Sequence, residues 1–126
     1  MIDTSPYPSL EEAGQQQVVL RTRDANARFN EDLTGQLEAA CRSRGIAYTY
    51  KDRYVGEVNQ ALEKAGQKQR SLGSTEMGRI IVASGGLVDG TTLQLPTTGY
   101  HTAHETASIA ACDVYIELLL SLAEQR

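Results

Sequence analysis

The 126-residue sequence contains no tryptophan, a single phenylalanine and only two cysteines. Cys41 and Cys112 lack the CxxC spacing of a zinc site, and each stands among apolar residues of an expected helix. Buried cysteines of this kind are usually packing residues. We therefore expect two free thiols rather than a disulfide or a zinc ligand.

Positive charge is also scarce, because 12 Lys and Arg stand against 16 Asp and Glu, a net charge of −4. Binding to nucleic acid or to an anionic membrane surface depends on clustered Lys and Arg, and the sequence shows no such patch. No apolar run approaches membrane-spanning length, and residues 1–6 do not resemble a signal peptide. We expect a cytoplasmic protein that binds neither nucleic acid nor membrane.

What is present is an ordinary globular composition, with 40% hydrophobic and 22% charged residues. A chain of this length fits one domain and can bury roughly two-thirds of its unfolded surface. We therefore treat residues 1–126 as a single domain.

The hydrophobic pattern alternates between strand and helix periods. Strands are expected at residues 18–21, 46–50 and 91–95, the last halted by Pro96, whereas Met1 and Ile2 alone are too few for one. Helices are expected from Asn30 to Gly45, over residues 55–65, after the loop that begins at residue 73, and from about Glu105 to Glu124. Asp24 reads as a solvated turn or Asx cap without a catalytic role.

The last of these helices has two specific expectations. Thr102 and Glu105 have the spacing of a capping box at its start. The recurring apolar residues predict its inner face as Ile109, Cys112, Ile116, Leu119, Leu120 and Ala123.

Strands that alternate with helices are typical of an α/β fold. We expect a three-layer αβα sandwich with a mixed, mostly parallel sheet. Ligands of such sheets bind beyond the carboxyl ends of the strands, which directs attention to the segment after Pro96.

That segment holds both histidines of the chain, His101 and His104. A histidine at a strand end can present one ring nitrogen to a metal while the other is oriented by an acceptor, and His101 fits this role best. His104 would share a helical face with His101. The alternative is that both are exposed polar residues near a helix start, because two histidines do not make a metal site.

Residues 95–105, LPTTGYHTAHE, resemble the strand–proline–aromatic–histidine–glutamate segment of the zinc-dependent glutamyl and tetrahedral aminopeptidases. The resemblance extends over nearly the whole chain. It implies that His101 is a metal ligand, that Glu105 orients its loop and that Tyr100 is adjacent to the site.

Two shorter segments are similar to the same family. Residues 73–78, GSTEMG, resemble a Gly-Thr-Asp-Ala-Gly segment near the active site, and Glu76 replaces the aspartate, which implies a residue adjacent to the site but not a ligand. Residues 2–4 resemble the strand end that supplies an aspartate ligand, which implies that Asp3 binds the second metal. The alternative for Asp3 is an exposed terminal residue.

The family's first metal-binding histidine, bridging aspartate, general-base glutamate and adjacent metal-binding glutamate all precede the segment that matches Asp3. The resemblance therefore implies the C-terminal part of a dinuclear-metal aminopeptidase, with two zinc or other divalent ions in the complete enzyme and a peptide substrate. We expect no catalytic residue in this chain and no turnover without the upstream half. The chain would associate with that half or form a homo-oligomer. The alternative is a non-catalytic α/β interaction module, a truncated or split remnant.

Overall fold

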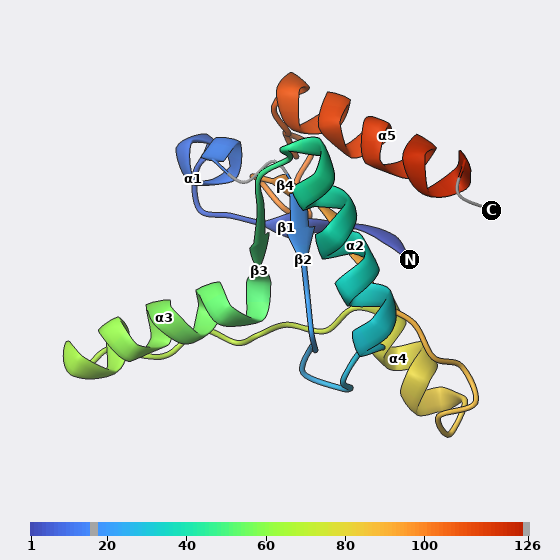
Figure 1. Ribbon diagram of the computed structural model, residues 1–126. Coiled ribbons are helices and arrows are strands. Elements are labelled where there is room, and N and C mark those ends of the chain that lie inside the picture. The colour runs from blue at the N-terminus through green and yellow to red at the C-terminus, as the bar shows by residue number, and fades with distance from the viewer. Residues whose placement is uncertain (16–17, 125–126) are drawn as a thin grey trace.

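The computed structural model describes residues 1–15 and 18–124, in which strands and helices alternate as an α/β fold (Figure 1). The strands are β1 (Ile2–Pro6), β2 (Val18–Leu20), β3 (Tyr48–Tyr50) and β4 (Leu93–Thr97). The helices are α1 (Leu10–Gln15), α2 (Glu31–Arg44), α3 (Lys51–Lys64), α4 (Glu76–Ala83) and α5 (Ile109–Glu124).

The four described strands form one sheet in the order β1-β4-β2-β3. β1 is parallel to β4 and β2 is parallel to β3, whereas β2 and β4 are antiparallel. The sheet is therefore mixed and mostly parallel, as predicted. In its register, Gln94 lies between Asp3 on one neighbouring strand and Val19 on the other.

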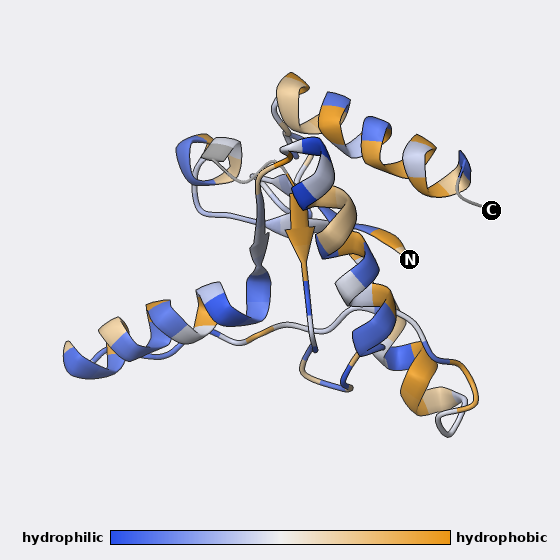
Figure 2. Cartoon of the chain, viewed as in Figure 1, coloured by the Kyte–Doolittle hydropathy of each residue, from blue (hydrophilic) through white to orange (hydrophobic). Residues whose placement is uncertain are grey.

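One face of the sheet carries the larger hydrophobic core and is covered by α2 and α5. Buried side chains of β2 and β4 pack there against buried side chains of both helices. The strands contribute Val18, Leu20 and Leu93, and the helices contribute Leu37, Cys41, Tyr115 and Leu118. Figure 2 shows β2 as a strongly apolar strand at the centre of this arrangement. Burying one leucine such as Leu118 contributes about 2 kcal/mol, so this face supplies most of the hydrophobic stabilisation.

The opposite face is covered by α1 and α3 and has a smaller core. Tyr7, Ala13 and Val19 are buried there, with Tyr54 of α3 packed against them. Helices on both faces make the three layers of the predicted αβα sandwich. Because side chains alternate along a strand, Gln94 faces this side between Leu93 and Leu95, which face the larger core.

The local signals for α2 are confirmed. Asn30 accepts a hydrogen bond from the backbone N–H of Leu33 (2.8 Å), and Gly45 ends the helix in a left-handed conformation with φ of 65°. Both cysteines are free thiols, with Cys41 fully buried and Cys112 half-buried. α3 begins at Lys51, four residues before the expected start.

Two expectations about strands are wrong. Residues 2–6 form β1, because pairing with β4 stabilises a segment whose own composition does not predict a strand. β4 does not stop at Pro96 but continues to Thr97. Among the described residues β2 pairs with Leu93 and Gln94, and Pro96 pairs with Ser5 of β1, so proline is tolerated there beside a single described neighbour, as in an edge strand.

The expected capping box of α5 is also wrong, because the helix begins at Ile109. Ser108 caps it, accepting a hydrogen bond from the N–H of Ala111 (3.0 Å). The Thr102 hydroxyl instead donates to the carbonyl of Gly99 within a turn. The earlier start fails because residues 98 and 106 pair as a short bridge and hold the chain in a loop.

The predicted inner face of α5 is wrong for most of its residues, although Leu119 does pack against the larger core. The buried residues are Ala111, Tyr115, Leu118 and Ser121, whereas Ile109, Ile116 and Leu120 are 81%, 55% and 60% exposed. The helix has apolar residues on more than one side, so its periodicity does not select the buried one. In the described part of the chain, no helix combines the length and apolar character needed to cross a membrane.

Candidate functional site

A cavity of about 920 Å³ opens on the α1/α3 side of the sheet. Its lining includes all five residues that the sequence marked as ligands or neighbours of a site, which are Asp3, Glu76, Tyr100, His101 and Glu105. These residues come from β1, the start of α4 and the loop after β4. The fold therefore brings them to one place although they span a hundred positions.

The loop after β4 holds His101 in an unusual backbone conformation. Its φ is 60°, and it is the only non-glycine residue with a positive φ in residues 1–15 and 18–124. Its ring stacks on Tyr100, with centroids 3.8 Å apart and planes inclined by 21°. Such backbone costs on the order of 1 kcal/mol or more and is found disproportionately at functional sites.

Glu105 fixes the same loop. Its carboxylate accepts a hydrogen bond from the Thr97 hydroxyl at the end of β4 (2.8 Å). His104 is exposed and lies outside the cavity lining, and its carbonyl accepts the Thr106 hydroxyl. Since residues 101–104 form turns, the expectation that both histidines share a helical face is wrong.

Asp3 is half-buried rather than an exposed terminal residue. One carboxylate oxygen accepts the backbone N–H of Thr4 (2.8 Å) and the other accepts the side-chain amide of Gln94 (3.2 Å). Thr97, which bonds Glu105, pairs with Pro6, three residues further along β1. At roughly 3.3 Å per residue, Asp3 therefore lies about 10 Å along the sheet from the point where Thr97 holds Glu105.

This arrangement fits a metal only in part. Asp3 and His101 line the same cavity, and both have the donor chemistry that zinc accepts. Across the described ranges, however, no group of three or more His, Cys, Asp or Glu side chains is placed to hold a metal ion. These residues do not form a complete metal site among themselves.

The sequence reasoning missed the inner end of the cavity, which is lined by Tyr7, Arg21 and Lys51, the Lys51 cluster. These residues are only 5%, 4% and 6% exposed. The Lys51 ammonium donates to the carbonyl of Pro6 and lies 3.8 Å from the centre of the Tyr7 ring. Arg21 donates to the side-chain oxygen of Gln94 (2.7 Å) and to the carbonyl of Leu72 (3.0 Å).

Burial changes the ionisation of this cluster. Burial, together with the positive charges of Arg21 and Arg70, lowers the pKa of Lys51 to about 8, although Glu12 acts in the opposite direction. Burial also raises the pKa of Tyr7 well above its usual range, so this hydroxyl stays protonated. The cluster therefore presents two cations and a neutral hydroxyl donor.

Two exposed arginines add to this charge. With Arg70 and Arg79, the lining contains four Lys or Arg against the three carboxylates Asp3, Glu76 and Glu105. The sequence shows no basic patch because these four cations are scattered over positions 21 to 79. The available signal was a charged residue directly after each of the strands β2 and β3.

A buried carboxylate holds the wall of the cavity at residues 71–76. Asp24 accepts hydrogen bonds from the backbone N–H groups of Asn26, Ala27 and Thr75 and from the Thr75 hydroxyl, all between 2.7 and 2.9 Å. Burial alone would raise the pKa of Asp24, but these bonds outweigh it and the pKa lies below its usual range. The expected turn at Asp24 is confirmed as an Asx turn, whereas its expected solvated position is wrong.

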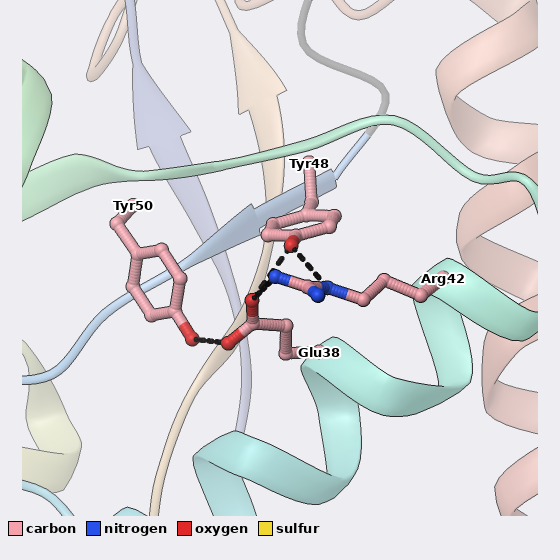
Figure 3. Close-up of polar contacts among 4 residues, drawn as sticks. All are labelled: Glu38, Arg42, Tyr48 and Tyr50. Atoms are coloured by element: carbon pink, nitrogen blue, oxygen red, sulfur yellow. Dashed lines mark hydrogen bonds and ion pairs between the residues drawn. The ribbon is translucent and has the colours of Figure 1, made fainter.

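A second polar cluster lies between α2 and β3 and consists of Glu38, Arg42, Tyr48 and Tyr50 (Figure 3), the Glu38 cluster. The two tyrosine hydroxyls donate to opposite oxygens of Glu38, each at 2.7 Å, and Arg42 pairs with the same carboxylate at 2.6 Å. Hydrogen bonds from Tyr50, Tyr48 and Arg42 lower the pKa of Glu38 to about 2. This cluster is structural, because its acceptor is saturated with donors from the protein itself.

Comparison with protein-family models, curated proteins and solved structures finds no match to this chain. The function is therefore inferred from the cavity and from the resemblance of the sequence motifs.

Proposed function

We propose that this chain is the C-terminal part of a dinuclear-metal aminopeptidase, which in its complete form hydrolyses N-terminal residues from peptides. In this proposal His101 and Asp3 each contribute one ligand to a different divalent ion, zinc or a similar metal. The observation that supports it is the convergence of Asp3, Glu76, Tyr100, His101 and Glu105 on one cavity. The loop that carries His101 follows the carboxyl end of β4, the usual place for ligands in α/β sheets.

The residues of this chain would hold and orient groups rather than transfer protons. Glu105, bonded to Thr97, would fix the loop that carries His101, and Tyr100 would hold the imidazole ring by stacking. Gln94 would orient the Asp3 carboxylate. The metal, when bound, would supply an activated water, and the resemblance assigns the general base to the upstream half.

It follows that the chain by itself should bind zinc weakly and have no peptidase turnover. Turnover would need another polypeptide that completes the ligand set, the upstream half of the enzyme, whether or not the chain also forms a homo-oligomer. We also propose a cytoplasmic location, with which the two free cysteines agree.

Zinc binding to the purified chain tests the role of His101. Titration calorimetry should give weak binding that His101→Ala abolishes, because a ligand is lost. His104→Ala is the matched control, since His104 is exposed outside the cavity. Equal affinities for the two variants would contradict the assignment of His101.

Turnover of amino-acid anilides in the presence of zinc tests the need for a partner. The chain alone should show none above a metal-only blank. Turnover that is lost in His101→Ala would show instead that the chain is a complete peptidase. If His101→Ala leaves zinc binding unchanged and no turnover occurs, the alternative of a non-catalytic interaction module is favoured.

A further inference from the structure

We propose that the Lys51 cluster binds the anionic group of a small molecule, a carboxylate or a phosphate, between Tyr7, Arg21 and Lys51. The proposal is independent of the peptidase function, because it rests on the buried end of the cavity and involves neither Asp3 nor His101.

Arg21 and Lys51 have no close counter-charge among the described residues. Arg21 and Lys51 are almost fully buried, yet within residues 1–15 and 18–124 the ion pairs are Arg42–Glu38 and Arg44–Glu117, and neither involves the cluster. A buried charge is costly unless it is paired. An anion in the cavity would supply the pairing that the described residues do not.

The negative charges of Asp24, Asp52 and Asp3 act on Arg21, Asp24 most strongly, but among the described residues no carboxylate lies within 4 Å of Arg21 or Lys51. Glu12 accepts the hydroxyl of Tyr54. Asp52 accepts the backbone N–H and hydroxyl of Thr22, at 2.9 and 2.7 Å. Asp3 reaches the cluster only through Gln94, whose oxygen accepts from Arg21 while its amide donates to Asp3. Gln94 thus separates the acidic and basic parts of the cavity.

Tyr7 carries an unused hydrogen-bond donor. Its hydroxyl is buried and has no hydrogen-bond partner among the described residues, and the residue is part of the cavity lining. Buried polar groups almost always have a partner, and leaving one without costs about 1–3 kcal/mol. A donor hydroxyl beside two cations is suited to an anionic oxygen.

The cavity is large enough for more than a single ion. Its volume of about 920 Å³ lies within the range of small-molecule sites. Arg70 is exposed on the lining, where it would meet an incoming anion before the buried cluster does. The ligand class is therefore a small molecule with a terminal carboxylate or phosphate.

Binding of inorganic phosphate and of glutarate to the full chain tests this proposal. Titration calorimetry at constant ionic strength, balanced with chloride, should show saturable binding of at least one probe, and the tighter probe identifies the anionic group. Tyr7→Phe should weaken that affinity by about tenfold, the size of one hydrogen bond to a charged group. Lys51→Met should weaken it further, because a charge is removed.

Tyr115→Phe is the matched control. Tyr115 is also a buried tyrosine, but its hydroxyl donates to the carbonyl of Leu93 on the opposite side of the sheet (2.8 Å). Tyr7→Phe should lower anion affinity without lowering the melting temperature, and Tyr115→Phe should do the reverse. Absence of saturable binding of both probes at 10-millimolar concentrations, about the weakest range of specific sites, would overturn the proposal. Equal affinities in the wild type, Tyr7→Phe and Lys51→Met would overturn it too.

Discussion

The Glu38 cluster and the Lys51 cluster each combine an arginine with two further hydrogen-bond donors, two tyrosines in the first and a tyrosine and a lysine in the second. Only the first contains a carboxylate, and it accepts from all three donors. In the second, Arg21 donates to Gln94 and Leu72 and Lys51 donates to Pro6, but none of these acceptors is a carboxylate, and the Tyr7 hydroxyl has no partner among the described residues. A cluster whose charges are met inside the protein is structural, whereas buried cations beside a cavity without a carboxylate acceptor indicate a place for an anionic ligand.

Substitution of Gly78 should have the largest effect, because it adds an atom beside a second saturated carboxylate, Asp24. A Cβ at Gly78 would lie 2.2 Å from an oxygen of Asp24, which its four hydrogen bonds hold in place. Gly78→Ala should therefore lower the free energy of unfolding by about 3 kcal/mol in urea denaturation. Gly56→Ala is the control, since Gly56 is helical with nothing near its Cβ, and should stabilise by about 0.5–1 kcal/mol.

Removal of the carboxylate from the Glu38 cluster should be the next largest change. Glu38→Ala leaves the hydroxyls of Tyr48 and Tyr50 and the guanidinium of Arg42 without their acceptor. We expect a loss of about 2 kcal/mol in the free energy of unfolding, because Tyr50 is buried. The double variant Glu38→Ala/Tyr50→Phe should recover part of that loss, and a full additive loss would contradict the coupling.

Lys51→Met should have the opposite sign. In buffer without multivalent anions it removes a buried, unpaired charge and should raise the free energy of unfolding by about 1–2 kcal/mol. The gain should shrink when phosphate or glutarate is added, because the anion stabilises only the wild type. A destabilised variant in both buffers would show that the contacts of Lys51 with Pro6 and Tyr7 outweigh its burial.

The smallest effects are expected in the dependence of stability on pH. The folded pKa of Glu38, about 2, lies below its ordinary value, so its contribution is present above about pH 4.5 and is lost as pH falls toward 2. The folded pKa of Lys51, about 8, also lies below its ordinary value, so stability should rise between pH 8 and 10 as the folded protein alone loses this proton. Arg21, Arg70, Glu12 and Tyr7 face Lys51 and set the size of that rise.

The change in the free energy of unfolding with pH should be on the order of 1 kcal/mol for each group. For Glu38 it is limited because solvent screens this partly exposed carboxylate. Urea denaturation from pH 3 to pH 10 measures both. Glu38→Gln should flatten the acid limb and Lys51→Met the alkaline limb. If either variant keeps the wild-type profile, the corresponding group does not titrate as described.

Local signals predicted those parts of the fold that neighbouring residues decide. The Asn30 cap, Gly45 and the apolar spacing between them defined α2, because caps and periodicity act within a few residues. The loop after β4 was found in the same way, since both histidines lie between a strand and a helix. Pairing was not predictable: β1 became a strand only through β4. The buried side of α5 was likewise not predictable, because it depends on how the helix packs against the larger core.

Local spacing in the sequence predicted an α/β domain and the order of most elements, and the resemblance selected five residues that line one cavity: Asp3, Glu76, Tyr100, His101 and Glu105. The tertiary structure brought Tyr7, Arg21 and Lys51 to the inner end of that cavity, which the sequence could not predict because they lie in separate segments that the sheet brings together. It also decided their chemistry. A lysine after a strand is unremarkable in a sequence, and burial beside two other cations lowers its pKa and leaves its charge to be met by an anion.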